Sequence, residues 1–240
     1  MLFKRHHNQL HYFHTLKGVL GMLRNPEHTE SVFDIEDGLK DIEATQEMVR
    51  YLKECRATKA MIEERWLATE DPDLDRLIEL PAGSLGHEFA RHIRDNGFDP
   101  DYFRKIKVRT DADYVMMRVR QTHDIWHMVT GFQTDRIGEV SLKAFELAQL
   151  RRPMAAVICS GAVIRFLMKD PEGLSDLLHG ISIGYRLGLG SEQFLGQKWE
   201  EHWERSITEW REMLGVRLDQ FEDEIQKPKP VRPSQQSSGD

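Results

Sequence analysis

The stretch Ala112-Asp-Tyr-Val-Met-Met-Arg-Val-Arg-Gln-Thr-His-Asp-Ile-Trp-His-Met-Val129 carries most of the information about the fold. Asp111 or Asp113 can cap the start of a helix here, and Gly131 can end it. Apolar or weakly polar residues recur at steps of three and four, the spacing of one helix face: Met116, Val119, His123, Trp126 and Thr130. The stretch therefore predicts a long helix whose histidines continue its buried side.

Three side chains of this predicted helix can bind a metal ion and project from one side of it. At about 100° per residue, His123, Asp124 and His127 fall at about 0°, 100° and 40° around the axis. Glu139 follows after eleven further residues, so all four donors lie in one window of seventeen residues. The candidate catalytic and metal-binding residues are His123, Asp124, His127 and Glu139.

A second helix is expected directly after the first. Thr134 or Asp135 can cap it, and its apolar stripe is Ile137, Val140, Ala144 and Leu147. A connection this short predicts that the two helices are antiparallel neighbours. In a hairpin with its midpoint near Gln133, position 139 lies across from position 127. This geometry predicts that the Glu139 carboxylate lies beside the His127 imidazole.

Two imidazoles with one or two carboxylates suit Zn²⁺, Fe²⁺ or Mn²⁺ and leave coordination positions open for a substrate or water. We expect Zn²⁺ first, with Mg²⁺ as a further candidate. Asp124 or Glu139 could instead orient an imidazole without binding the ion. In the alternative interpretation, the histidines are satisfied core residues and the carboxylates serve helix ends. The carboxylates that accompany the H-x₃-H spacing favour the metal site.

The residues around this window extend the pattern. His123-Asp-Ile-Trp-His127 with Glu139 resembles the HDxxH-x₁₁-E signature of the Coq4 family of ubiquinone-biosynthesis proteins. Other stretches that resemble the family are Leu80-Pro-Ala-Gly-Ser-Leu-Gly-His87, Gly138-Glu139, Lys143-Ala-Phe-Glu146 and Pro153-Met154. The resemblance spans residues 19–216. The chain departs from it at Lys198-Trp-Glu-Glu201, where many members carry Tyr-Tyr-Glu, and at Ser182-Ile-Gly184, where they carry Trp-Ala before the glycine.

The resemblance implies a helical protein that binds a long isoprenoid tail in an apolar channel, with the head group of the lipid at the metal. It implies removal of the C1 carboxyl group of a polyprenylated hydroxybenzoate, coupled in some members to hydroxylation. His123, Asp124, His127 and Glu139 would be the ligands. It also implies a polyprenyl lipid or quinone precursor as partner, with other ubiquinone-biosynthesis enzymes, a second copy of the chain and a membrane surface as further partners.

Composition agrees with such a protein. The 240 residues are 40% hydrophobic and 30% charged, with a formal net charge of −7 that argues against nucleic acid as a partner. Cys55 and Cys159 are the only cysteines, which predicts neither a disulfide framework nor a thiolate metal site. Residues 1–24 have no signal-peptide or transit-peptide pattern. We therefore expect a cytoplasmic, bacterial protein, with peripheral contact at the inner face of the membrane.

The rest of the chain predicts helices and no strands. Apolar residues recur at helical spacing over residues 39–52, 85–93 and 194–210. Within the last segment we expect a stripe of packed aromatic side chains, formed by Trp199, Trp203 and Trp210. We expect a solvated face formed by Glu200, Glu201 and Glu204. Gly184, Gly188 and Gly190 predict tight helix packing, because their spacing matches no nucleotide loop.

The apolar run 154–168 is too short to span a bilayer, which takes about 20 residues. It predicts a central core helix, with an isoprenoid-channel lining or a membrane-facing helix as alternatives. We predict an all-α, single-domain helical bundle over residues 1–225, followed by a disordered tail over 226–240, which is rich in proline, serine and glutamine.

Three functions are compatible with these patterns. The first is a metal-dependent decarboxylase of polyprenyl hydroxybenzoates, and the second is a non-catalytic scaffold that presents isoprenoid lipids to other enzymes. The third is a metal phosphohydrolase, for which His87 and His92 are the obvious additional donors.

Overall fold

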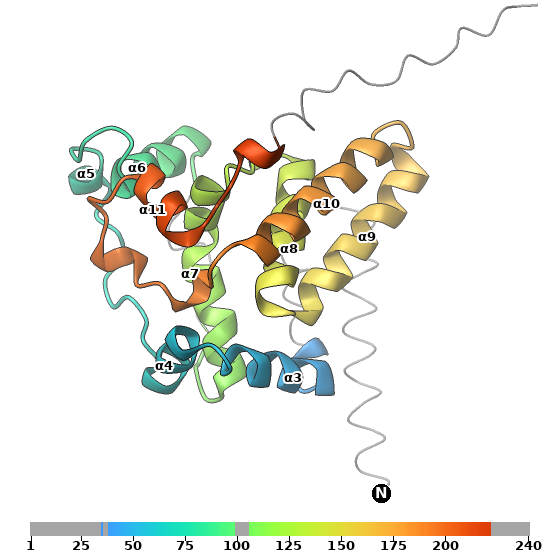
Figure 1. Cartoon of the computed structure of the whole chain (residues 1–240), viewed down its shortest axis with the longest axis horizontal. Coiled ribbons are helices and arrows are strands. Elements are labelled where there is room, and N and C mark those ends of the chain that lie inside the picture. Colours follow the sequence, from blue (N-terminus) through green and yellow to red (C-terminus); the bar gives the residue numbers. More distant parts are fainter. Residues whose placement is uncertain (1–34, 36–37, 99–105, 222–240) are drawn as a thin grey trace, which may run out of the picture.

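The stretch 112–129 forms the central helix of the fold, α7 (Asp111–Thr130) (Figure 1). The structure is a computed structural model that describes residues 35, 38–98 and 106–221. Thr110 is its N-cap, rather than the predicted Asp111 or Asp113. The Thr110 hydroxyl accepts from the backbone N–H of Asp113, whose carboxylate accepts from the N–H of Thr110. The cap lies one residue earlier than predicted because this reciprocal pair satisfies two free backbone donors. Gly131 ends the helix, as predicted, with a φ of 76°.

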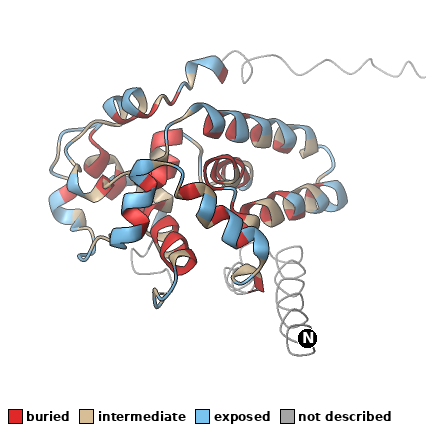
Figure 2. Cartoon of the chain, turned by 60° about the horizontal axis from the view of Figure 1, so that its bottom comes forward, coloured by how far each residue is buried: buried red, intermediate tan, exposed pale blue. Residues whose placement is uncertain are grey.

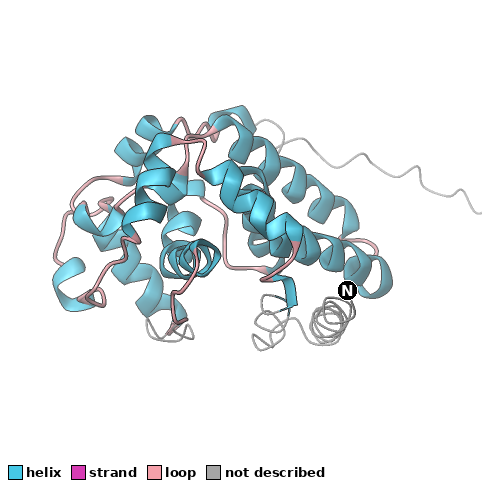
Figure 3. Cartoon of the chain, turned by 90° about the horizontal axis from the view of Figure 1, so that it is seen from below, coloured by secondary structure: helices cyan, strands magenta, loops and turns pink. Residues whose placement is uncertain are grey.

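The described residues fold into helices joined by loops (Figure 3). This confirms the all-α prediction, and the one β-type pairing among them is an isolated bridge between Ser84 and Ser206. Besides α7, the helices are α3 (Glu43–Leu52), α4 (Arg56–Glu64), α5 (Leu74–Leu77), α6 (Leu85–Asn96), α8 (Arg136–Leu150), α9 (Pro153–Lys169), α10 (Leu174–Gly190), the 3-10 turns η1 (Phe194–Gly196) and η2 (Trp199–Glu201), and α11 (Ile207–Leu214).

Helix α7 lies between two groups of helices (Figure 1). On one side α8, α9 and α10 pack against one another, and on the other α6 and α11 contact α7. Helices α3 and α4 pack near its N-terminal end. Helix α8 is buried along almost its whole length, whereas α9 and α10 bury the sides that face the interior and expose their outer sides (Figure 2). The centre of α7 is therefore enclosed from several directions.

Glycines let α10 approach α8 closely. A Cβ atom at Gly184 would lie 2.0 Å from the backbone oxygen of Ser141, and one at Gly188 would lie 2.7 Å from that of Phe145. Neither oxygen can move without distorting α8, so these positions require glycine. The predicted tight packing is confirmed at both. At Gly190, the third glycine, an added Cβ atom would have no other atom within 4 Å, so this position does not require glycine.

Gly184→Ala is expected to lower the free energy of unfolding by at least about 1–3 kcal/mol, the usual cost of overpacking a well-packed core. The physical reason is the clash between the new methyl group and the Ser141 oxygen. Gly190→Ala is the matched control, because that position is open and the same substitution should leave stability nearly unchanged. Urea unfolding followed by circular dichroism measures both, and equal midpoints for the two variants would contradict the packing argument.

The predicted helix over 194–210 is wrong. The segment contains η1 and η2, and α11 begins only at Ile207, where Ser206 and Glu209 form a capping box. Before that cap the backbone carbonyls of Trp203 and Arg205 accept hydrogen bonds from the start of α6. These contacts between distant segments hold the chain in a turn that interrupts the helical pattern. The tryptophan packing is nevertheless confirmed for Trp199 and Trp210, which are buried with ring centroids 4.4 Å apart.

Helix α9 is not the predicted central core helix. Met154, Ala155 and Phe166 are buried, but Leu167 and Met168 are 62% and 68% exposed. The helix lies at the outside of the α8–α10 group (Figure 1), and among the described helices it packs against α8, α10 and α3. Among the described helices none has the length and apolar character needed to cross a membrane. The predictions for residues 1–24 and for the tail at 226–240 fall outside the described residues.

Candidate metal centre

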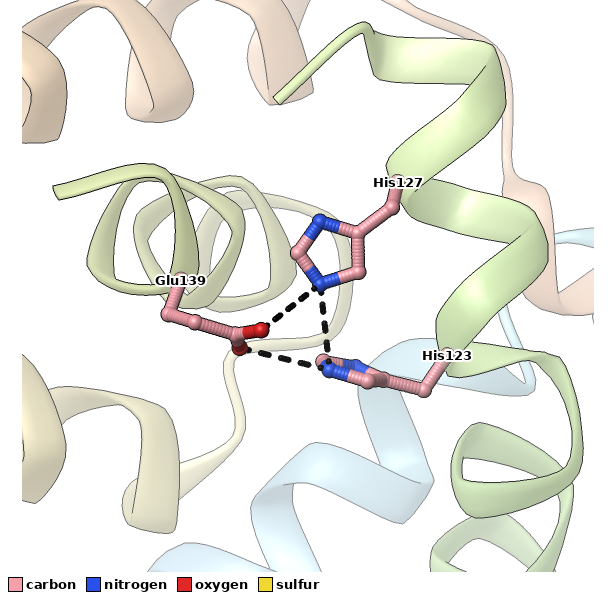
Figure 4. A group of neighbouring side chains, drawn as sticks. All are labelled: His123, His127 and Glu139. Atoms are coloured by element: carbon pink, nitrogen blue, oxygen red, sulfur yellow. Dashed lines mark hydrogen bonds and ion pairs between the residues drawn. The ribbon is translucent and has the colours of Figure 1, made fainter. Parts of the chain in front are cut away.

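Three of the four predicted site residues meet between α7 and α8 (Figure 4). His123 and His127 lie one turn apart on α7, and Glu139 lies in the first turn of α8. The Nε2 atoms of the two histidines are 3.3 Å apart. One Glu139 oxygen lies 3.2 Å from Nε2 of His127 and the other lies 3.4 Å from Nε2 of His123. The structure thus brings together three side chains of metal-binding type.

The link between the helices places Glu139 beside the histidines. Asp135 caps α8, as predicted, by accepting from the backbone N–H groups of Ile137 and Gly138. A Cβ atom at Gly138 would lie 2.1 Å from the backbone oxygen of Gln133, so only glycine allows the chain to turn this tightly before Glu139. The predicted proximity of positions 127 and 139 is therefore correct.

The two helices are neighbours, as predicted, but they do not pack together extensively as an antiparallel pair would. Helix α8 packs most extensively against α10 and little against α7. The glycines of α10 allow a closer approach to α8 than the larger side chains of α7 would, so α8 follows α10. Contact between α7 and α8 is sufficient to bring His127 and Glu139 together.

The spacing of the donor atoms fits a divalent ion. An ion with tetrahedral ligands at about 2.0–2.1 Å holds its ligand atoms about 3.3 Å apart. The three donor-to-donor distances are 3.2, 3.3 and 3.4 Å. His127 is oriented for this role, because its Nδ1 donates to the backbone oxygen of Phe132 at 2.9 Å and its Nε2 faces the other donors. The three side chains therefore fit three corners of one coordination sphere.

The electrostatics favour the protonation states that metal binding needs. Burial, reinforced by the positive charge of Lys143, lowers the pKa of His123, which favours a neutral imidazole. Burial alone would raise the pKa of Glu139, but hydrogen bonds and charge from His123 and His127 outweigh it and hold the pKa well below its usual range. An ionised carboxylate can donate electron pairs to a metal, and a protonated histidine would release its proton as the ion binds.

Asp124 does not join the three donors. It is half-buried on α7, and the group of potential metal-binding side chains found among the described residues contains only His123, His127 and Glu139. Its 100° offset from His123 around the helix explains the separation. Its role as a ligand stays a prediction, and its charge acts on His92, which lies nearby on α6.

Two further residues lie at the site. The sequence did not indicate Lys143, and it indicated His92 only as an additional donor of a phosphohydrolase, whereas His92 lies outside the group of three donors. Lys143 lies one turn after Glu139 on α8, and its charge acts on His123. His92 comes from α6, and its ring lies 6.4 Å from that of His127 with an angle of 24° between the planes. The i, i+4 spacing from Glu139 could have indicated Lys143. His92 is 31 positions before His123, and no local pattern connects them.

Comparison with known proteins identifies the family of this chain. Residues 11–219 match the model of the family described as "Coenzyme Q (ubiquinone) biosynthesis protein Coq4". Two fungal relatives are named mitochondrial ubiquinone biosynthesis protein COQ4. The relative from Eremothecium gossypii is 31% identical over 70% of this chain and 52% of its own length. The one from Talaromyces stipitatus is 35% identical over 62% of this chain and 52% of its own length. The chain thus spans about half the length of these relatives.

A solved structure extends the similarity to the fold. It is the crystal structure of a protein from Nostoc punctiforme whose description proposes a role in ubiquinone biosynthesis. It superposes with a TM-score of 0.79 at 34% sequence identity, over 87% of this chain and 98% of that one. Because the family match covers most of the sequence, including all three gathered donors, the chain belongs to the Coq4 family of coenzyme Q biosynthesis proteins.

Proposed function

We propose that this protein acts in ubiquinone biosynthesis and catalyses the metal-dependent removal of the C1 carboxyl group from a polyprenylated hydroxybenzoate. The observation that carries the proposal is the close approach of His123, His127 and Glu139, with donor atoms 3.2–3.4 Å apart. Family membership supports the pathway. We propose Zn²⁺ as the ion, with Fe²⁺, Mn²⁺ and Mg²⁺ as alternatives for the same donors.

The chain's own residues prepare the site for this reaction. Two helices and a glycine-dependent turn hold the three donors, so little reorganisation is needed when the ion binds. Lys143 adds a positive charge beside His123, which favours an anionic head group. A bound divalent ion would supply Lewis-acid chemistry that stabilises negative charge on the head group as carbon dioxide leaves.

The lipid part of the proposal concerns the surface. Exposed apolar side chains on α9 and α10 support contact with a membrane or an isoprenoid tail: Ile164, Leu167, Met168, Leu178 and Leu189. The relatives are named as mitochondrial proteins. Cytoplasmic location, contact with other ubiquinone-biosynthesis enzymes and a homodimer stay predictions for this chain.

The test is release of labelled carbon dioxide from a prenylated 4-hydroxybenzoate with a ¹³C carboxyl group, by protein loaded with each candidate metal. We expect release by the wild type and none above background by His127→Ala, because the substitution removes a donor. The control is His179→Ala, which changes an exposed histidine of α10. Runs with and without oxygen separate replacement of the carboxyl group by a proton from oxidative replacement by a hydroxyl group.

Turnover that survives in His127→Ala would overturn the proposal. If no metal supports release, but the prenylated compound binds wild type and His127→Ala equally well, the protein is a lipid-presenting scaffold. Release of phosphate from phosphate esters would instead assign it to the phosphohydrolases.

A further inference from the structure

His92 has a buried nitrogen atom beside the candidate metal centre. Its Nε2 atom is buried and has no hydrogen-bond partner among the described residues. The ring lies nearly parallel to that of His127, and it meets the ring of Phe98 edge-on with centroids 5.7 Å apart. The charges of Asp124, His127 and Glu139 all act on it. His92 is therefore close to the site, held by its neighbours and unpaired at one end.

Asn96 determines which nitrogen of His92 carries hydrogen. The Asn96 side-chain nitrogen donates to the His92 backbone oxygen at 2.8 Å, and it also lies 3.4 Å from Nδ1 of the ring. An amide nitrogen is only a donor, so Nδ1 is the acceptor of this pair. The hydrogen of a neutral ring then lies on Nε2. The buried, unpaired atom is consequently a hydrogen-bond donor.

The same geometry argues against His92 as a further metal ligand. His123, His127 and Glu139 place their donor atoms within 4.8 Å of one another, and His92 is not part of that group. A nitrogen that carries hydrogen has no free electron pair for a metal. It does have the chemistry to bind an oxygen atom of a ligand held by the neighbouring donors.

We propose that His92 donates a hydrogen bond from Nε2 to an oxygen atom of an aromatic carboxylate head group bound at the candidate metal centre. The inference rests on the proposed function for the class of ligand, and on the buried donor for the residue. Buried donors are almost always paired in folded proteins, so a ligand oxygen would satisfy a donor beside the site that the described residues leave unpaired. His92 is thereby a substrate-binding residue contributed by α6.

The test is calorimetric titration of 4-hydroxybenzoate into Zn²⁺-loaded protein, with metal content measured on every sample. His92→Phe keeps a ring between Phe98 and His127 but removes the donor, and we expect affinity to fall about 10- to 100-fold, as for loss of a hydrogen bond to a charged group. His92→Gln can place an amide donor near the position of Nε2 and should restore most of the affinity. His179→Gln, on the exposed side of α10, is the control.

Three results would overturn the inference: equal affinity in His92→Phe and wild type, loss of the metal from His92→Phe, or no binding by the wild type. Loss of the metal would instead make His92 part of the metal site. A different result would contradict the proposed function alone: 4-hydroxybenzoate binds through His92, but no carbon dioxide is released from the prenylated substrate. Thermal unfolding of each variant shows whether a loss of affinity reflects a loss of folding.

Discussion

His127→Ala is expected to lower the affinity for Zn²⁺ by more than the roughly 10- to 100-fold that loss of an outer-sphere partner costs. His127 is 2% exposed and contacts both other donors. Removing its imidazole leaves His123 and Glu139, and two protein donors hold zinc far less well than three. Metal content by plasma mass spectrometry, followed by competition with a chelator, measures the effect.

Two further variants distinguish a metal site from a buried histidine pair. Glu139→Gln keeps the volume of the side chain but removes its charge, so it should also lose metal. Asp124→Asn should retain metal, because the structure places Asp124 outside the three donors. If Asp124→Asn lost its metal, Asp124 would be the fourth ligand that the sequence predicted. Full metal content in His127→Ala, or a wild type that binds none of the candidate metals, would make the histidines structural.

The candidate site was predictable from the sequence because its donors are local. His123 and His127 share a face of one helix, and a short capped link returns the chain to Glu139. Helix periodicity and capping signals describe interactions over a few residues, and they are sufficient here. His92 enters through the packing of α6 against α7. No periodicity encodes such a contact between distant segments, so its place at the site required the structure.

In the fold, too, local patterns were predicted correctly and contacts between distant segments were not. Helical spacing correctly predicted the all-α class, but it failed over 194–210. There, hydrogen bonds from the start of α6 hold the residues before α11 in a turn. The predicted solvated face is confirmed for Glu201 and Glu204, which are exposed, but it is wrong for Glu200. Glu200 binds the fully buried guanidinium of Arg118 through both carboxylate oxygens, at 2.6 and 2.9 Å. A charge pattern along one segment gives no information about a buried partner 82 positions away.

Glu146→Gln is expected to lower the free energy of unfolding at pH 7 by about 3–5 kcal/mol, the usual cost of removing one partner from a buried ion pair. Glu146 is 1% exposed on α8 and accepts hydrogen bonds from Lys143 at 2.8 Å and from Arg152. Glutamine has nearly the same volume but no charge, so the variant removes the buried negative charge that Lys143 and Arg152 share. Denaturant unfolding followed by circular dichroism measures the difference.

The pH dependence of this effect has a definite sign. Burial alone would raise the pKa of Glu146, but the charges of Lys143 and Arg152 outweigh it and lower the pKa from 4.5 to about 2. A carboxyl group whose pKa is lowered by folding stabilises the protein above its unfolded pKa, and this contribution disappears as the pH falls through the folded value. The stability difference between wild type and Glu146→Gln should therefore be largest above about pH 4.5 and shrink towards pH 2.

The matched control for Glu146→Gln is Glu47→Gln, which removes a carboxylate paired with Arg50 on the exposed side of α3. Water screens that pair, so its loss should change stability little. Equal destabilisation by the two variants, or a Glu146→Gln effect that does not change between pH 7 and pH 2, would contradict the role of the buried carboxylate. Lys143 binds Glu146 and also acts on His123, so the expected result would show that the buried ion pair behind the candidate metal centre stabilises the fold.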